Sequence, residues 1–422
     1  MIKNKPELIL FDKPSSLDSI TQLNNMGFFK NQYSNYLNEY PNSNLIFFDF
    51  TKFKKINDQF SHDIGNLCLA SFGKILKTVF PDSLLTRQHG DEFLILTNNS
   101  TEKIAQKFDE CKKLIAKDND TKLIPLVYGF NAGVVPAEEN IRESISKAEI
   151  MMYEAKNKSV TYLDFDETIY DEVIKDKGFL KKTSQAIESD RLPLASRTIY
   201  QANRIPTEII DVYTRDIENN KLFTDQRLRL LKESGNLRKL DYLNLRKIIL
   251  SSAIPCGRKI IINVYAHSLL NIVEPFPRFL ATLVSVMNNN PEDFIICVNV
   301  SDFNDNYSEL VEQLNLIGRY GFEVALSGFE LNENNPFLYI WPQVNLKYMK
   351  ISPSLWKIAK ENKKYYSLLN YNVQAFLEND MLPIFMKIET EEELAFIKNI
   401  SDKVLFEGNL TDKEKHISFN RN

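Results

Sequence analysis

Apolar residues alternate between two patterns along the first part of the chain, up to about residue 166. Continuous apolar runs of strand length predict buried strands, and they lie at 45–50, 93–96 and 123–128. Stretches with an apolar residue every three or four positions predict helices, and they lie at 53–60, 64–79, 102–116 and 140–158. A polar stretch leading into apolar residues at 18–23 predicts a further helix start, capped by Asp18 or Thr21. The alternation of strand and helix predicts an α/β layered domain.

A second series of elements follows residue 166. The segment 167–189 is rich in charge and carries spaced apolar residues, which predicts a connecting helix or helix pair. Beyond it, strand-like runs lie at 209–213, 259–264, 294–300, 323–326, 348–351 and 382–388. Helical stretches alternate with them at 227–250, 279–287, 309–320 and 391–397. Repeated βα units over about 250 residues predict a TIM-like barrel, whose functional residues lie at the carboxyl ends of its strands.

Length and charge limit the classes of protein to consider. The chain has 422 residues, more than one hydrophobic core usually holds, so we expect two domains. A net charge of −4 and a pI near 5.8 provide no broad basic surface for nucleic acid. The apolar run near the start is too short for a signal peptide or a membrane span. The four cysteines lie far apart without metal-type spacing, so we expect reduced thiols in a cytoplasmic protein.

Two adjacent carboxylates mark the turn of a predicted β-hairpin. The polar segment 87–93 separates the apolar runs 83–85 and 93–96, and Asp91 and Glu92 fall at its tip. Asp49 ends the apolar run 45–50, so the three carboxylates meet at one sheet edge if the two strands are neighbours. Three oxygen ligands suit Mg²⁺ holding a phosphate, because carboxylates at close range repel one another until a cation binds. A solvated turn is the alternative interpretation.

The hairpin segment resembles the signature of a known family. Residues 87–93 read Arg-Gln-His-Gly-Asp-Glu-Phe, which resembles the R-x-G-G-D/E-E-F signature of GGDEF domains, the diguanylate cyclases that make cyclic di-GMP from two GTP. Further stretches resemble other motifs of that family in the same order, and they lie at 18–25, 49–58, 62–65 and 152–156. The resemblance covers nearly all of the first half and implies a GGDEF-type α/β sandwich over residues 1–166.

The resemblance also implies roles for particular residues. Asp49, Asp91 and Glu92 take the positions of the family's metal-binding carboxylates, which implies a possible Mg²⁺ site. Lys156 takes the position of a phosphate contact. In an active cyclase, Asp91, Glu92 and Lys156 would be the catalytic residues.

The nucleotide-binding positions depart from the family pattern. Asn57 keeps one guanine contact, but its partner Asn66 stands where the family has Asp. An amide presents a donor to a guanine donor, which costs roughly 1–3 kcal/mol. His89 replaces the first glycine of the signature, beside Gly90, where the family lets nucleotide approach bare backbone, so its side chain should crowd the ligand. Ser159 and Val160 replace a Gly-Arg pair, which removes a phosphate-binding guanidinium.

The second half resembles the EAL domain, the cyclic di-GMP phosphodiesterase, in the order of its motifs. The stretches that stand in for the motifs lie at 211–215, 263, 299–302, 325–329, 349–352, 385–390 and 407–408. That family needs two divalent ions bridged by carboxylates to activate a water. Its acidic positions are occupied here by Asn299, Ser327, Gly328, Ser352 and Met386.

The polar residues that remain in the second half do not make up a two-metal site. They are Asp211, Asn263, Lys350 and Glu389. One carboxylate and an amide cannot hold two ions against water, so we expect no metal in this half and no phosphodiesterase activity. Arg215 and Lys350 could bind a phosphate, or they could be solvated or ion-paired cations at the barrel rim.

The sequence therefore predicts a cyclic di-GMP signalling protein with a GGDEF-like domain at 1–166 and a degenerate EAL-like domain at 167–422, of which 167–189 connects the two. We expect a non-catalytic regulator that binds GTP, cyclic di-GMP or a protein partner, and that binds neither nucleic acid nor membrane. The alternative is a weakly active diguanylate cyclase. Such an enzyme must dimerise, and we find no dimerising segment before Asp18.

Overall fold

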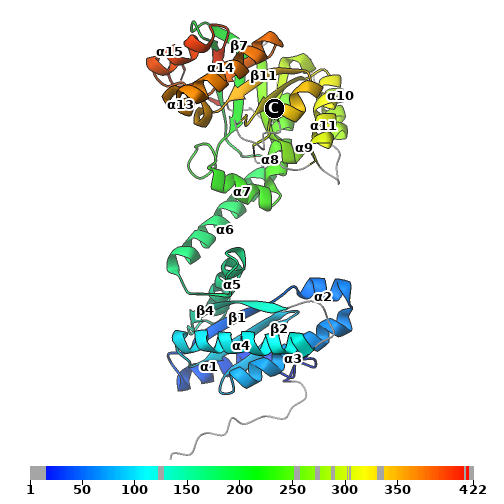
Figure 1. The fold of residues 1–422 in the computed structure, drawn as a ribbon, viewed down its shortest axis with the longest axis vertical. Helices are drawn as coiled ribbons and strands as arrows, with labels where there is room; N and C mark the ends of the chain where they lie inside the picture. The colour runs from blue at the N-terminus through cyan, green and yellow to red at the C-terminus, as the bar shows by residue number, and fades with distance from the viewer. Residues whose placement is uncertain are drawn as a thin grey trace, which may run out of the picture. The chain divides into compact units, whose positions relative to one another are not determined.

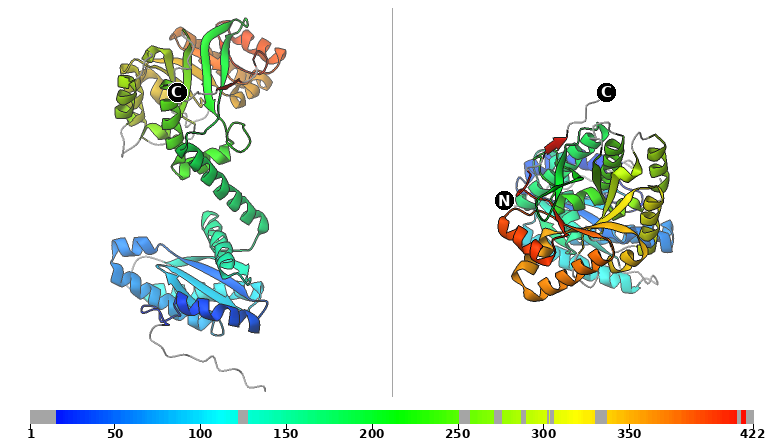
Figure 2. Two further views of the ribbon diagram at one scale, coloured as in Figure 1. Left: turned by 180° about the vertical axis from the view of Figure 1, so that it is seen from behind. Right: turned by 90° about the horizontal axis from the view of Figure 1, so that it is seen from above.

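The structure is a computed structural model that describes residues 16–121, 128–250, 257–270, 276–286, 290–301, 303, 306–329, 337–412 and 415–417. The chain divides into two compact units, Met1–Lys175 and Asp176–Asn422 (Figures 1 and 2). The division falls inside helix α6 (Glu167–Glu188), which spans nearly all of the predicted helical segment 167–189. The first part of α6 packs on the core of the first unit through Ile169 and Val173, and its last part packs in the second unit through Phe179 and Ile187.

The first unit is a five-stranded sheet covered by helices on both faces. Its strand order is β2-β3-β1-β4-β5, in which β4 and β5 are parallel and the other pairs antiparallel. The strands are β1 (Asn44–Thr51), β2 (Leu84–His89), β3 (Glu92–Thr97), β4 (Gly129–Pro136) and β5 (Tyr162–Asp164). The helices are α1 (Met26–Glu39), α2 (Phe53–Gln59), α3 (His62–Val79), α4 (Thr101–Thr121) and α5 (Ile141–Asn157). The predicted α/β layered domain is confirmed.

Strand β1 shows why its sequence is continuously apolar. Ile46, Phe48 and Phe50 belong to one core cluster, while Leu45 and Phe47 belong to the cluster on the opposite face. A strand that is buried on both faces does not alternate between apolar and polar residues. The central strand of the sheet is therefore recognisable as an uninterrupted apolar run.

One prediction for the first unit is wrong, and another lies mostly outside the described residues. The predicted helix start at 18–23 is wrong, because Asp18 accepts hydrogen bonds from the backbone of Ile20 and Thr21 and closes a turn. Helix α1 begins at Met26 and is capped by Asn25. The predicted strand 123–128 falls almost entirely outside the described residues, and strand β4 begins after it. A Cβ on Gly133 of β4 would lie 2.0 Å from the Ala148 carbonyl oxygen, so this strand needs a small residue where helix α5 crosses it.

The second unit contains a closed barrel of eight strands. The strand order runs from β13 down to β6, and a further pairing between β13 and β6 closes the sheet. The strands are β6 (Leu194–Gln201), β7 (Pro206–Thr214), β8 (Lys259–Tyr265), β9 (Phe294–Asn299), β10 (Glu323–Ser327), β11 (Leu346–Ile351), β12 (Leu382–Phe385) and β13 (Leu405–Phe406). Strand β6 is antiparallel to both of its barrel neighbours, and β7 to β13 are parallel to one another. A short strand, β14 (Lys415–Ile417), pairs with β6.

Helices cover the barrel, and apolar side chains fill its interior. The helices are α7 (Asp225–Glu233), α8 (Asn236–Ile249), α9 (Ala266–Leu269), α10 (Phe276–Val286), α11 (Tyr307–Arg319), α12 (Phe337–Ile340), α13 (Pro353–Glu361), α14 (Lys363–Glu378) and α15 (Glu391–Ile400), with 3₁₀ turns at Pro291–Asp293 and Trp341–Gln343. One apolar cluster contains at least one residue from each of the eight barrel strands, among them Ile261, Ile295 and Ile384. The predicted TIM-like barrel is confirmed.

The barrel differs from the prediction at several elements. The predicted helix 227–250 is two helices, because Gly235 adopts a left-handed φ of 70° between them. Strand β6 and helices α13 and α14 were not predicted. Within the described part of the chain, no helix combines the length and apolarity that crossing a bilayer requires.

Candidate functional site

The hairpin β2–β3 brings the predicted carboxylates of the first unit together. Asp49 on β1 lies directly opposite Glu92 on β3 in the antiparallel register. The backbone N–H of Phe50 donates to the Asp91 carbonyl oxygen at 3.1 Å. The three acidic residues therefore share one edge of the sheet, as the sequence predicted.

Each of two carboxylates at this edge is already paired with a basic side chain. Lys156 Nζ donates to Asp49 Oδ2 at 2.6 Å, and His89 Nε2 lies 3.1 Å from Glu92 Oε2. Burial and the Asp49 charge raise the pKa of Asp91, and burial raises the pKa of Glu92 against the opposing effect of His89. Such crowding favours a bound cation, but over the described ranges no three acidic, histidine or cysteine side chains are arranged as a metal site.

Arg87 fixes the tip of the hairpin, a role that the sequence did not predict. Its guanidinium donates to both carboxylate oxygens of Asp18 at 3.1 Å and to the carbonyl oxygen of Gly90 at 2.7 and 2.9 Å. The pKa of Asp18 is lowered: partial burial works in the other direction, but hydrogen bonds from Thr21 and Arg87 outweigh it. Gly90 has a left-handed φ of 54° and open space around it. The arrangement presents an exposed backbone turn beside the carboxylates.

Asn57 and Asn66 lie on neighbouring helices. Asn57 belongs to α2, and Asn66 follows Gly65 on α3. A Cβ on Gly65 would lie 2.0 Å from Asn57 Oδ1, so glycine lets the two helices approach. That oxygen is buried, and no partner for it is found among the described residues. Its hydrogen-bonding capacity is therefore unmet by the described residues in this arrangement.

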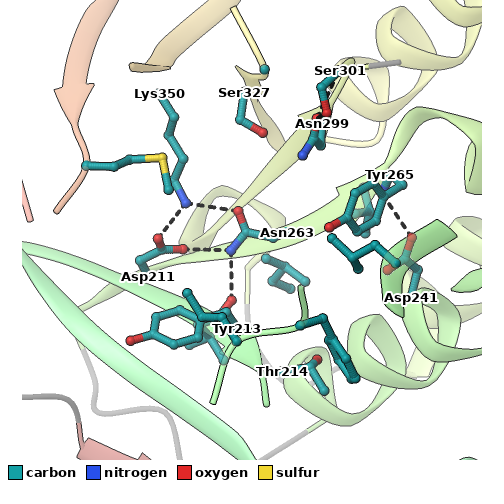
Figure 3. Close-up of a pocket in the computed structure, with 18 of the residues that line it drawn as sticks. Asp211, Tyr213, Thr214, Asp241, Asn263, Tyr265, Asn299, Ser301, Ser327 and Lys350 are labelled. Atoms are coloured by element: carbon teal, nitrogen blue, oxygen red, sulfur yellow. Dashed lines mark hydrogen bonds and ion pairs between the residues drawn. The ribbon is translucent and has the colours of Figure 1, made fainter. Parts of the chain in front are cut away.

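A cavity of about 550 Å³ opens at the carboxyl ends of the barrel strands, and a closed polar network lies in its wall (Figure 3). Lys350 Nζ donates to Asp211 Oδ2 at 2.5 Å and to Asn263 Oδ1 at 2.9 Å. Asn263 Nδ2 in turn donates to Asp211 Oδ1 at 2.8 Å and to the Val212 carbonyl oxygen at 2.9 Å. Asp211 and Lys350 are 2% and 1% exposed, so water contributes little to their solvation. Burial opposes the charge of Lys350, but the Asp211 carboxylate raises the pKa of this lysine above its usual value.

The positions that lost acidic residues line the same cavity. They are Asn299, Ser327, Gly328, Ser352 and Met386. Asn299 Oδ1 accepts from the backbone and the hydroxyl of Ser301 at 2.9 and 2.7 Å, so this amide is engaged within the protein. A Cβ on Gly328 would lie 2.5 Å from the Ser301 nitrogen, and its φ of 83° favours glycine. The motif positions converge as predicted, without their carboxylates.

Two other predicted residues are not in this cavity wall. Arg215 donates to the Asn220 carbonyl oxygen, and its guanidinium lies 5.9 Å from the centre of the Tyr213 ring. Glu389 accepts from Asn409 at 3.4 Å. Neither belongs to the residues that line the cavity.

The cavity also contains charged residues that the sequence did not single out. Glu407, at the end of β13, is 4% exposed; burial raises its pKa, and Arg197 Nε lies 3.8 Å from its carboxylate. Asp241 on α8 accepts from the Tyr265 backbone N–H at 2.9 Å, and burial raises its pKa to about 7. Glu407 stands at the glutamine of a motif, which was an available signal. Arg197 had none, because its strand was not predicted.

Comparison with known proteins supports the assignment of the first unit. Residues 15–160 match the family model for "Diguanylate cyclase, GGDEF domain". The chain is similar to the probable diguanylate cyclase DgcT of Escherichia coli, with 32% identity over 120 residues, 26% of this chain and 26% of that protein. It is also similar to the signaling protein YkoW of Bacillus subtilis, with 29% identity over 197 residues, 42% of this chain and 24% of that protein. The GGDEF resemblance of the first unit is confirmed, while the matches span only about a quarter of these relatives.

Two solved structures are similar across the barrel. The Vibrio cholerae LapD S helix-GGDEF-EAL structure bound to c-di-GMP covers 94% of this chain and 96% of its own, with 14% identity and a TM-score of 0.49. The FimX EAL domain of Pseudomonas aeruginosa bound to c-di-GMP covers 57% of this chain and 96% of its own, with 16% identity and a TM-score of 0.47. In this chain the unit that matches the GGDEF family model precedes the TIM-like barrel.

Proposed function

We propose that this chain is a cyclic di-GMP signalling protein whose degenerate EAL-like barrel binds cyclic di-GMP and does not hydrolyse it. The observation that carries the proposal is the closed network of Asp211, Lys350 and Asn263 in the cavity wall. It places an ammonium group against the carboxylate that keeps the position of a metal ligand.

The charges in the cavity argue against a two-metal centre. Two divalent ions need several carboxylates in common, and the oxygens of Asp211 are already occupied by Lys350 and Asn263. A second buried carboxylate of the wall, Glu407, lies beside Arg197. Divalent ions that bind Asp211 would therefore have to displace Lys350, whose buried ammonium would lose its counterion.

The same cavity has the properties of a ligand site. Its volume of about 550 Å³ lies within the usual range of about 300–1,000 Å³ for small-molecule pockets. Its wall combines apolar residues such as Leu237 and Leu240 with cations and with carboxylate and amide acceptors. Apolar surface suits a purine ring, cations suit phosphate, and carboxylate or amide oxygens suit the N–H groups of guanine. A guanine dinucleotide presents all three.

Calorimetry with the full chain tests the proposal. We expect cyclic di-GMP to bind with the same affinity in EDTA and in Mn²⁺, and chromatography of the same samples to show no linear dinucleotide. Asp211→Asn changes the charge of the wall but keeps its shape, and it should alter affinity without creating hydrolysis. Metal-dependent hydrolysis by the wild-type chain, abolished in Asp211→Asn, would refute the proposal. Absence of any binding would refute it as well.

A second candidate function is weak diguanylate cyclase activity of the first unit. Asp49, Asp91 and Glu92 lie together with Lys156 at the hairpin, which favours this candidate. Asp49, Asp91 and Glu92 are the residues that would hold Mg²⁺, which would supply positive charge for the phosphates of GTP. Lys156 would contact a phosphate, and Asn57 would contact the guanine. Incubation with GTP and Mg²⁺ followed by chromatography tests this; cyclic di-GMP that disappears in Asp91→Ala would establish it.

A further inference from the structure

Lys387 combines a strained backbone with a position in the wall of the barrel cavity. It lies between strand β12 and helix α15 and has a φ of 57°, in the left-handed region that disfavours residues with a side chain. Of the described non-glycine residues with positive φ, Lys387 alone lines the cavity. Backbone strain that persists at a ligand cavity is a recurrent feature of functional sites.

Hydrogen bonds on both sides impose this backbone conformation. Met386 N donates to the Ile351 carbonyl oxygen at 3.1 Å, and the Met386 carbonyl oxygen accepts from Trp356 Nε1 at 3.0 Å. Ile388 N donates to the Glu407 carbonyl oxygen at 2.9 Å. Residue 387 must therefore adopt a left-handed φ whichever side chain it carries, and glycine is the residue that would adopt it without strain.

Close packing of the residue after Lys387 prevents the backbone there from shifting. A Cβ on Gly408 would lie 1.9 Å from the Ile388 carbonyl oxygen, so the segment that follows Lys387 is pressed against the segment that follows β13. The chain cannot relieve the strain at residue 387 by shifting Ile388. A lysine at this point therefore needs an explanation other than backbone geometry.

The charges around the cavity indicate what the lysine does. Four cations line it: Lys350 is paired with Asp211, Arg197 lies beside Glu407, and Arg229 and Lys387 are exposed. Lys387 forms no ion pair with the part of the chain that the structure describes, although its charge acts on Glu407. Glu407 already has Arg197 Nε 3.8 Å from its carboxylate. The ammonium of Lys387 is thus available to an anionic ligand in the cavity.

We propose that Lys387 is a specificity-determining residue of the barrel cavity, which contacts a phosphate of the bound dinucleotide. The inference rests on the proposed function, because it takes cyclic di-GMP as the ligand. The affinity of the barrel for cyclic di-GMP then depends on Lys387, whose backbone adopts a conformation suited to glycine. Lys387 therefore lowers the stability of the barrel while it strengthens ligand binding.

Three substitutions separate charge from strain. Lys387→Gly removes both, Lys387→Ala removes the charge and keeps the strain, and Lys387→Arg keeps both. Asp380→Gly is the matched control, because Asp380 also has a left-handed φ, of 56°, in the same unit and does not line the cavity. Calorimetry with cyclic di-GMP and the thermal unfolding midpoint are measured for the full chain carrying each substitution.

We expect Lys387→Gly and Lys387→Ala to weaken cyclic di-GMP binding about five- to tenfold at low salt, because each removes one charge-assisted contact. The difference from wild type should shrink at high salt. Lys387→Gly and Asp380→Gly should raise the midpoint of barrel unfolding by about 1–3 °C, since relief of strain exceeds the added entropy of the unfolded chain. Lys387→Arg and Asp380→Gly should bind as the wild type does.

The outcomes distinguish the two proposals. If the wild type binds cyclic di-GMP and Lys387→Gly and Lys387→Ala bind it equally well, the lysine is only tolerated and this inference is wrong while the proposed function stands. If the wild type does not bind cyclic di-GMP at all, both fail.

Discussion

Removing the ammonium from the buried network of the barrel is the most informative perturbation of stability. Lys350→Met keeps most of the side-chain volume and leaves the Asp211 carboxylate, which is 2% exposed, with only Asn263 as a partner. A buried ion pair broken on one side typically costs about 3–5 kcal/mol, because a desolvated charge stays behind. The double substitution Asp211→Asn with Lys350→Met removes both charges and should recover most of that loss.

The two tryptophans of the chain provide a selective assay. Trp341 and Trp356 both belong to the second unit, so tryptophan fluorescence during urea unfolding reports on the barrel and not on the first unit. We expect Lys350→Met to lower the free energy of barrel unfolding by about 3–5 kcal/mol at pH 7, and the double variant to lose about 1–2 kcal/mol. If Lys350→Met lowers the free energy of unfolding by less than about 1 kcal/mol and the double variant recovers nothing, Lys350 does not neutralise a buried charge on Asp211.

Three further predictions concern other residues of the two units. Burial raises the pKa of Asp241 from 3.8 to about 7, so the folded state binds this proton more tightly than the unfolded state does. The free energy of barrel unfolding should therefore fall between about pH 4 and pH 7. Urea titrations across this pH range should show a smaller decline for Asp241→Asn. Gly408→Ala should destabilise the barrel by about 2–4 kcal/mol in the same fluorescence assay, because the added Cβ would clash with the Ile388 backbone. A Gly408→Ala variant as stable as the wild type would contradict this close packing. Asn66→Asp should tighten GTP binding by roughly tenfold or more, since it restores an acceptor for the guanine N–H groups, and calorimetry that finds equal affinities would show that Asn66 does not contact guanine.

The first unit was largely predictable because its signals are local. The apolar run of β1, the helical spacing of α3 and the polar turn of the hairpin each lie within a few residues. Strand β4 escaped prediction because Gly133 breaks its apolar run, and that glycine is needed by a helix later in the chain. The turn at 18–23 was misread because Asp18 can cap a turn as well as a helix, and its partner Arg87 lies 69 residues away.

The site in the barrel was less predictable, because it depends on contacts between residues far apart in the sequence. The sequence identified Asp211, Asn263 and Lys350 separately, by their places in a series of motifs. It could not show that they form one hydrogen-bonded network, because 139 residues separate Asp211 from Lys350. Nor could it reveal the strain at Lys387, which depends on hydrogen bonds from strands and helices on both sides.

In the function that we propose, Lys350 and not a pair of metal ions neutralises the carboxylate of Asp211 in the barrel wall. The most direct test is an anomalous difference map from a crystal of the full chain soaked in MnCl₂ and cyclic di-GMP. We expect dinucleotide density in the cavity and no manganese peak beside Asp211. A pair of manganese peaks bridged by Asp211, with Lys350 displaced from it, would show that metal ions and not the lysine neutralise this carboxylate.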